Sequence, residues 1–424
     1  MHPNGQLPAY EWAFGDVNPP VHAWAALRVF AIDGSRDTDF LARMFHKLLL
    51  NFTWWVNRKE TLDDNVFTGG FLGLDNIGPF DRSAVLPSGV VLEQADSTAW
   101  MAMFCRDLLE MALELANHDP AYQDVAIKFF EHFANIAGAM SRGGLWDEAD
   151  GFYYDRLRFP DGRVLPLRTR SMVGLVPLCA ALALPHAQWA RLPEFRTRAE
   201  WFVTHRLRER ASGHYVIREI AEGTDLVTLV DVARLRRLLG TMLDEEEFLS
   251  PYGLRSLSRY HRDHPFVLSD PDRGREFVVD YEPAESTAGL FGGNSNWRGP
   301  IWFPLNYLVI RVLRRLHAGL GETFTVELPT GSGRYTHLGN VADDLERRLL
   351  RLFLPDATGR RPIWGSCALF REDPAWRDEL LFHEYFHGET GEGLGASHQT
   401  GWTALIAALV AERRGRVPGE REVL

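Results

Sequence analysis

The sequence predicts a mainly α-helical protein whose helices pack as hairpins around a common axis, an arrangement called an α/α barrel. Apolar residues recur at steps of three and four residues in nine segments, which is the period of an amphipathic helix. Long loops rich in Gly, Pro, Asp and aromatic residues separate these segments. Because a rigid scaffold commonly presents functional residues on its loops, we expect the loops to gather at one mouth of the barrel.

The sequence predicts a single domain in which helices alternate with long loops. The less periodic stretch at about 209–290 is expected to be an inserted subdomain within a single domain spanning residues 1–424. The chain opens in the middle of what looks like a turn, so we expect a fragment that lacks an N-terminal accessory region or the first helix of the barrel. The helices are expected at 20–30, 40–56, 95–116, 121–140, 170–184, 193–208, 302–317, 341–353 and 402–413, and the long loops at 64–87, 143–155, 277–300 and 382–400.

The charge and residue composition of the chain limit the kinds of ligand and the cellular location that we expect. The net charge of −11 argues against nucleic-acid and anionic-membrane partners, which select clustered Lys and Arg, and favours a neutral ligand. The basic runs at 234–237 and 311–315 contain apolar residues, as expected of exposed helix faces. The three cysteines lie far apart and predict buried, reduced thiols. Neither a secretion signal nor a stretch of 18 apolar residues occurs, so we expect a cytoplasmic protein.

Aromatic residues make up 12% of the chain, and many of its 13 tryptophans fall in or beside the loops. Sugar rings stack on aromatic planes, and their hydroxyl groups need carboxylates, amides and guanidinium groups, so this mixture favours a carbohydrate ligand. The alternative is that these tryptophans only anchor loops to the helices.

Two loop carboxylates are candidates for catalysis of glycosidic bond cleavage, which needs one acid and a second carboxylate across the sugar ring. Asp75 lies among glycines, with Leu72 and Leu74 able to raise its pKa, as a general acid requires. Glu384 lies in an aromatic segment before a glycine-rich turn, as a general base would. His383 and His387 are four residues apart, but the glycines that follow indicate a loop, so no metal site is expected.

These segments resemble glycoside hydrolase family 63, and the resemblance extends over nearly the whole chain. Gly73-Leu74-Asp75-Asn76 is similar to the segment that carries the family's general acid, and Glu384 lies in a Glu-Tyr-Phe segment similar to the one that carries its general base. The stretch from Trp297 through Arg298 to Trp302 resembles the family's Trp-Arg-Gly-x-x-Trp stretch, which lines the sugar site.

Further candidate sugar-binding residues match more loosely. Trp12 and Asp16 resemble part of a Trp-Asp-x-x-Phe-His motif, with Gly15 in place of the tryptophan that precedes the aspartate. Asp96 is expected either near the site or only as the N-cap of the helix that follows. Tyr153 or its neighbour Tyr154, in a predicted hairpin or loop at residues 146–155, is expected to face a sugar.

The resemblance implies an all-α fold with an (α/α)6 barrel, an inverting mechanism, α-linked glucosyl or mannosyl substrates and no cofactor. Inversion requires room for water between the carboxyl groups, a separation of about 6.5–9.5 Å. Two alternatives stay open, an inactive carbohydrate-binding relative with the same barrel and an enzyme of another class, such as a sugar epimerase with paired histidines.

Overall fold

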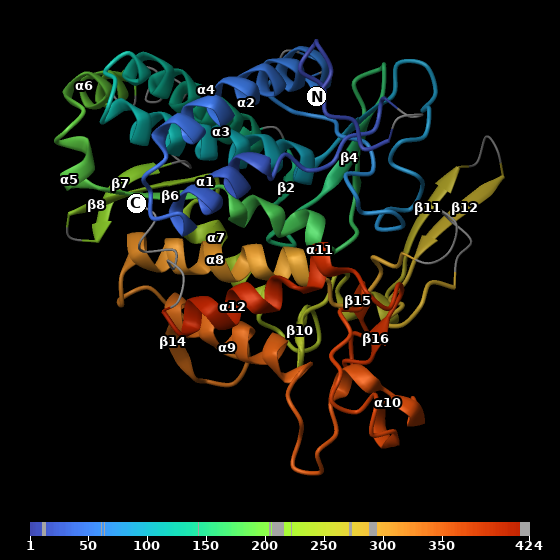
Figure 1. Cartoon of the computed structure of the whole chain (residues 1–424). Helices are drawn as coiled ribbons and strands as arrows, with labels where there is room; N and C mark the ends of the chain where they lie inside the picture. Colours follow the sequence, from blue (N-terminus) through green and yellow to red (C-terminus); the bar gives the residue numbers. More distant parts are fainter. Residues whose placement is uncertain are drawn as a thin grey trace.

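The computed structural model describes residues 1–10, 14–60, 62, 64–142, 144–202, 205, 216–221, 223–270, 274–287 and 295–415. Helices dominate it and are stacked in layers, with α2 and α4 on one side and α9 and α12 on the other (Figure 1). The α-helices are α1 (His22–Ile32), α2 (Thr38–Lys59), α3 (Ala95–Ala116), α4 (Tyr122–Arg142), α5 (His186–Trp189), α6 (Pro193–Phe202), α7 (Val232–Met242), α8 (Phe303–Leu320), α9 (Leu338–Arg351), α10 (Ala368–Glu372), α11 (Thr400–Thr403) and α12 (Leu405–Arg413).

The helices α3 and α8 form the centre of the molecule. Most residues of α3 are buried around its whole circumference, as in a helix surrounded by others, and it packs against α2 and α4. Helix α8 is similarly buried and packs against α9. By contrast, α9 has one apolar stripe, which faces α8, and a charged outer face. The central position of α3 and α8 matters because each begins beside a segment that carries candidate site residues.

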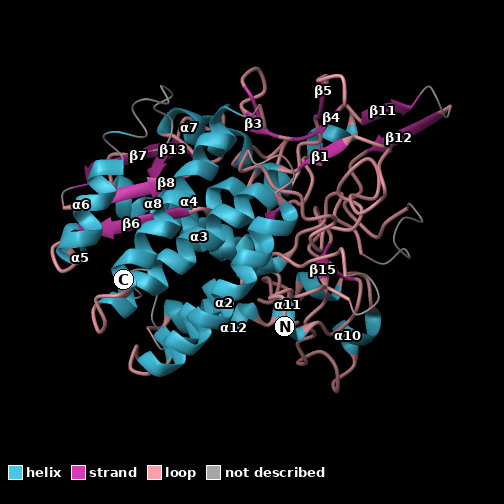
Figure 2. Cartoon of the chain, turned by 90° about the horizontal axis from the view of Figure 1, so that it is seen from above, coloured by secondary structure: helices cyan, strands magenta, loops and turns pink. Residues whose placement is uncertain are grey.

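Small antiparallel sheets accompany the helices. Figure 2 shows most of the irregular loops gathered on one side of the helical body, as the sequence predicts. The sheets pair β1 (Val91–Glu93), β4 (Asp155–Arg158) and β5 (Val164–Leu167); β6 (Ala181–Pro185), β8 (Thr224–Thr228) and β7 (Val216–Ala221); β2 (Trp146–Asp147) and β3 (Phe152–Tyr153); β9 (Leu249–Ser250) and β10 (Gly253–Leu254); β11 (Phe266–Asp270) and β12 (Arg275–Val279); β13 (Thr325–Glu327) and β14 (Tyr335–His337); and β15 (Tyr385–Phe386) and β16 (Gly393–Leu394).

The prediction of a mainly helical protein is confirmed, and the hairpin expected at 146–155 forms through β2 and β3. The helix predicted at 170–184 is wrong. Short 3-10 turns at Met172–Gly174 and Val176–Cys179 occupy this stretch, followed by β6. Pro177 removes a backbone donor, and the apolar residues after it pair with β8 instead of continuing a helix. The closed ring of six hairpins stays a prediction.

The segment predicted as an insertion, at about 209–290, contains α7 and several short strands. Its β8 pairs with β6, which precedes the segment, whereas β11 and β12 form a hairpin that projects from the body (Figure 1). Its status as a separate subdomain stays a prediction.

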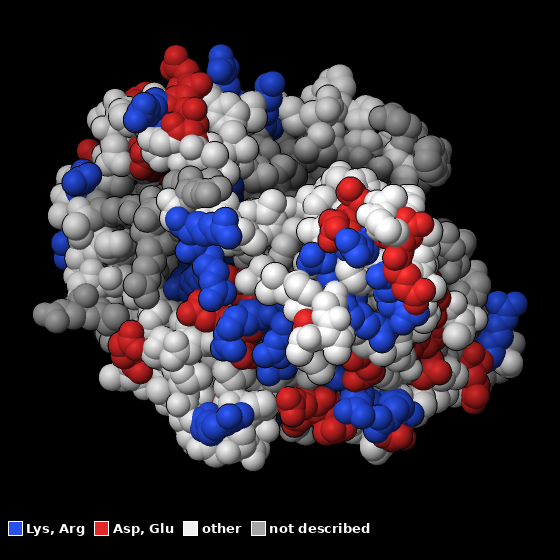
Figure 3. Space-filling model, turned by 60° about the horizontal axis from the view of Figure 1, so that its bottom comes forward, with Lys and Arg blue, Asp and Glu red and all other residues white. Residues whose placement is uncertain are grey.

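The surface mixes charges of both signs. On the face shown in Figure 3, acidic and basic side chains lie beside one another. Within the described residues, the search for a helix long and apolar enough to cross a membrane found none.

Candidate active site

Gln94, the residue just before α3, fixes the loop that carries Asp75 through side-chain hydrogen bonds to the loop backbone. Gln94 is fully buried, and its Oε1 accepts hydrogen bonds from the Gly69 and Gly70 backbone N–H groups (2.6 and 3.0 Å). Its Nε2 donates to the Gly70 carbonyl (2.8 Å). Gly70 has φ +72°, and a Cβ there would come within 2.9 Å of Ser83 Oγ, so glycine is required for both conformation and space.

Beyond Asp75, Asn76 joins the loop to a segment more than 200 residues away. Asn76 Oδ1 accepts from the Trp297 backbone N–H (2.6 Å), and its Nδ2 donates to Asn296 Oδ1 (3.2 Å). Arg298, which is 3% exposed, donates to the carbonyls of Asn76 (2.7 Å) and Gly78 (3.1 Å). Arg298 therefore fixes the backbone that follows Asp75, because its guanidinium donates to these two carbonyl groups.

Glu384 reaches the same region from the other side. Its segment pairs with Ile301, because the Ile301 and Phe386 backbones exchange hydrogen bonds of 2.8 and 3.0 Å. Glu384 Oε2 accepts from the Ala396 N–H (3.0 Å). A Cβ at Gly395 would lie 2.8 Å from that oxygen, so the glycine-rich turn lets backbone approach the carboxylate closely.

The segments that carry Asp75 and Glu384 both join the stretch at residues 297–301, and we call the region around these two residues the carboxylate site. Burial raises the pKa of Asp75 above its ordinary value, and a hydrogen bond from Ser295 opposes that shift. The negative charges of Glu384 and Asp81 raise the pKa further. A like charge raises the pKa of a carboxyl group because it disfavours the ionised form.

Asp16 lies at the edge of the carboxylate site. Its Oδ1 accepts a 2.6 Å hydrogen bond from the Ser83 hydroxyl. The Ser83 oxygen in turn accepts a hydrogen bond from the Phe71 backbone N–H. Tyr10 stacks on Phe71 with ring centroids 5.6 Å apart, and burial together with the charges of Asp75 and Asp16 raises the pKa of its hydroxyl. Trp12 lies outside the described residues.

The predicted tryptophans form a stack of rings. Trp297 and Trp302 are 2% and 0% exposed and lie parallel, with centroids 3.9 Å apart. The other face of Trp302 meets Tyr385 at 4.8 Å, and Trp302 Nε1 donates to the Asn296 carbonyl (2.8 Å). The stack therefore packs against the segment of Glu384 through Tyr385. Trp402 is half-buried and lies next to Trp302.

Asp96 occupies a buried ion-pair cluster. It pairs with Arg82, whose guanidinium also lies 3.2 Å from Asp155. The interpretation of Asp96 as an N-cap is wrong, because Gln94 holds that position and Asp96 lies in the first turn of α3. Burial and the charge of Asp96 raise the pKa of Asp155 to about 6, although Arg82 opposes the shift.

Tyr153 is also buried, at 1% exposure, and packs edge-on against Trp146 with centroids 4.8 Å apart. Burial raises the pKa of its hydroxyl. In this structure the side chain belongs to the core, so it offers no surface to a sugar.

Sequence reasoning missed Glu285. Its carboxylate accepts from the Tyr385 hydroxyl and from the Gly395 N–H (3.1 Å), so it contacts residues on both sides of Glu384 in space. Its position in the long loop at 277–300, among glycines and aromatic residues, was the available signal.

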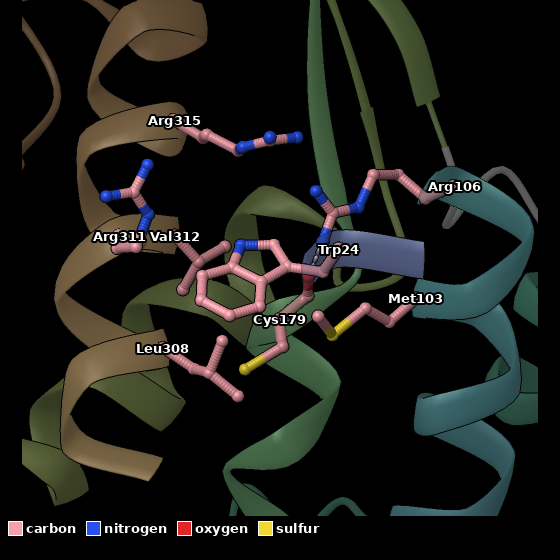
Figure 4. A pocket seen from close by; sticks show the side chains of 8 residues that line it. All are labelled: Trp24, Met103, Arg106, Cys179, Leu308, Arg311, Val312 and Arg315. Carbon is pink, nitrogen blue, oxygen red and sulfur yellow. Dashed lines mark hydrogen bonds between the residues drawn. The ribbon is translucent and has the colours of Figure 1, made fainter. Parts of the chain in front are cut away.

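A separate pocket lies between α1, α3 and α8 (Figure 4). It contains about 230 Å³ of space, part of it open to solvent. Arg311 and Arg315 line it and are 2% and 4% exposed, so the exposed face predicted for the basic run at 311–315 is wrong. Arg315 pairs with Glu110 (2.9 Å) and Arg311 with Glu412, which explains how these cations are tolerated inside. The pocket is lined by Trp24, Met103, Arg106, Cys179, Leu308, Arg311, Val312 and Arg315.

The family model described as "Mannosylglycerate hydrolase MGH1-like glycoside hydrolase domain" matches residues 195–403. A mannosyl-oligosaccharide glucosidase of Saccharomyces cerevisiae is 25% identical over 179 residues, 42% of this chain and 15% of that protein. Over residues 195–403 the chain is therefore similar to a glycoside hydrolase domain.

Another relative of this chain is uncharacterized protein YMR196W of Saccharomyces cerevisiae, 51% identical over 437 residues. The match covers 97% of the chain and 40% of the yeast protein, so the chain spans well under half of that relative. Among solved structures, an uncharacterized conserved protein from Thermus thermophilus aligns with TM-score 0.51 and 16% identity, covering 97% of this chain and 84% of that one. At this identity the likeness concerns the fold alone.

Proposed function

We propose that the chain is an inverting glycosidase in which Asp75 is the general acid and Glu384 the general base. The observation that carries the proposal is that the segments of Asp75 and Glu384 both join the stretch at residues 297–301, through the Asn76–Trp297 hydrogen bond and the Ile301–Phe386 backbone pair. The charge of Glu384 also raises the pKa of Asp75. The match of residues 195–403 to a glycoside hydrolase domain supports the reaction class.

The environments of the two groups suit different roles. Asp75 keeps its proton to higher pH than an ordinary aspartate, so it can protonate the oxygen of the leaving group. Glu384 is oriented by the Ala396 N–H, which leaves its other oxygen to accept a proton from water. Water then attacks the anomeric carbon on the face opposite the leaving group, and the configuration is inverted.

We infer a substrate with an α-linked glucosyl or mannosyl group, either a small glycoside or an oligosaccharide. The names of the matching family and relatives support these sugars. An anionic aglycone such as glycerate would need a cation near the leaving group. Arg298 already serves backbone carbonyls, and Arg168 pairs with Asp147 (2.9 Å), so a neutral aglycone fits better.

The fold that goes with this proposal is an (α/α)6 barrel with an insertion at about 209–290. The helix pairs α3–α4 and α8–α9 and the gathering of loops on one side support it. We also propose a cytoplasmic location and a carbohydrate as the partner.

Time-resolved NMR of the anomeric product tests the proposal on a panel of α-glucosides, α-mannosides and their glycerates. Release of the β-anomer, abolished in Asp75→Asn and in Glu384→Gln, is expected. Asp81→Asn is the matched control, because Asp81 is a neighbouring acid whose hydrogen bond from the Ser83 N–H (2.8 Å) an asparagine can keep. Retained turnover in either catalytic variant, or release of the α-anomer, contradicts the assignment. Binding without turnover across the panel identifies an inactive carbohydrate-binding relative.

A further inference from the structure

A cluster of two histidines and a glutamate lies at the C-terminal end of α8, and it belongs to no part of the carboxylate site. Among the described residues, His317, Glu322 and His337 form a group whose donor atoms all lie within 4.8 Å of one another. His317 follows the first residue of α8 by 14 positions, which places it about 21 Å along the helix from the end beside Trp302. We propose that these three side chains bind a zinc ion that joins α8 to α9.

Local structure brings the three ligands together. Helix α8 ends at Leu320, and Gly321, with φ +71°, turns the chain so that Glu322 returns toward His317. Strand β13 then pairs with β14, with Thr325 opposite His337. His337 is also the residue that precedes α9. The cluster therefore sits where the end of one central helix meets the start of its neighbour.

The ligand atoms lie within reach of one ion, and the two histidines contact different oxygens of the Glu322 carboxylate. The Nε2 atom of His317 lies 3.3 Å from one Glu322 oxygen, and the Nε2 atom of His337 lies 3.2 Å from the other. Ligands about 2.0–2.1 Å from a tetrahedral zinc ion are separated by roughly 3.3–3.4 Å. Two neutral imidazoles and one carboxylate form a familiar zinc donor set, with a fourth position left for water.

A glycine keeps the space that the two rings occupy. The rings stack with centroids 4.5 Å apart. A Cβ on Gly339, the second residue of α9, would lie 3.0 Å from His317 Cδ2 and 3.1 Å from His337 Cε1. Glycine inside a helix is less stable than alanine. The position therefore favours the close approach of the histidines over the intrinsic stability of α9.

Proton positions distinguish the metal-free and zinc-bound forms. Without metal, each Nε2–H can donate to Glu322, and His337 Nδ1 accepts a long 3.3 Å bond from the Asn340 N–H. With zinc on Nε2, the neutral His337 ring carries its proton on Nδ1, and this capping bond is lost. A helix cap contributes far less free energy than a structural zinc ion supplies.

Isothermal titration of the chelator-treated chain with zinc chloride tests the proposal. His337→Asn removes the ligand but keeps a residue that caps helices well, and Glu322→Gln changes a side chain that is 73% exposed, so both variants should fold. His186→Asn is the control, because His186 forms a similar pair with Asp225 (3.4 Å) outside the cluster.

We expect the wild type and His186→Asn to bind one equivalent of zinc and to gain thermal stability from it. His337→Asn and Glu322→Gln should lose affinity by about a hundredfold or more, since even the loss of an outer partner costs about 10–100-fold. Absence of binding by the wild type, or unchanged binding by both cluster variants, overturns the proposal. None of these measurements depends on glycosidase activity.

Discussion

Gln94→Ala should destabilise the chain and slow catalysis together, because Gln94 holds the base of the Asp75 loop. The substitution removes three hydrogen bonds, two accepted from Gly69 and Gly70 and one donated to the Gly70 carbonyl. A buried hydrogen bond contributes about 1 kcal/mol net, so the expected loss of unfolding free energy is about 3 kcal/mol. The α3 helix itself loses no cap, since the Gln94 side chain makes no capping bond.

Urea unfolding of the variant measures this loss, and kcat reports the position of Asp75. A displacement of about 1 Å in a catalytic group can cost about a hundredfold in rate. Gln123→Ala is the matched control, because Gln123 is also a buried glutamine but accepts only one hydrogen bond, from the Phe195 N–H (3.2 Å). It should cost about 1 kcal/mol and leave kcat unchanged. Equal unfolding curves for Gln94→Ala and the wild type would refute the reasoning.

Two further predictions concern charge. Glu384→Gln removes a neighbouring negative charge, so the pKa of Asp75 should fall. A ¹³C titration of the carboxyl groups measures this pKa, with Asp75→Asn as the control that assigns the signal. An unchanged pKa of Asp75 would mean that the two groups do not share a site. The pKa of Asp155 is raised from about 3.9 in the unfolded chain to about 6 in the folded one, so the stability this group contributes is present below about pH 4 and is lost as pH rises through 6. Asp155→Asn can keep the acceptor for the Ala95 N–H (2.8 Å), and Arg82 still pairs with Asp96 in this variant. The unfolding free energy of the variant relative to wild type should therefore rise between pH 4 and 7. Parallel plots of unfolding free energy against pH for the two proteins would count against this account.

The sequence predicted best what depends on local pattern. The periodicity at 95–116 gives both ends of α3 correctly, and the segment around Asp75 lies in an irregular loop, as predicted for residues 64–87. The stretch at 170–184 misled, because its apolar residues fit a buried strand as well as a helix and only the pairing with β8 decides. Helix α7 was absorbed into the predicted insertion, since its polar surroundings concealed its period.

Long-range pairings were beyond the reach of the sequence. Asp96 looked like a cap or a site residue because its partners, Arg82 and Asp155, are identified only when the fold joins them. Arg311 looked exposed because a cation is rarely buried without a partner, and that partner, Glu412, comes from α12. The motif around Trp297 indicated the correct region, but only the fold shows that its rings stack on one another behind the carboxylates.

The tie between Asn76 and residues 296–297 has a consequence for how the chain acquires its shape during synthesis. Such a contact closes a very long loop, and contacts of large sequence separation form late and slowly. When α3 and α4 have left the ribosome and can pair locally, the Asp75 loop still lacks its partner, and Glu384 arrives later still. Ribosome-bound intermediates should therefore contain a protected α3–α4 pair and an unprotected Asp75 loop, so the carboxylate site is among the last parts of the chain to become ordered.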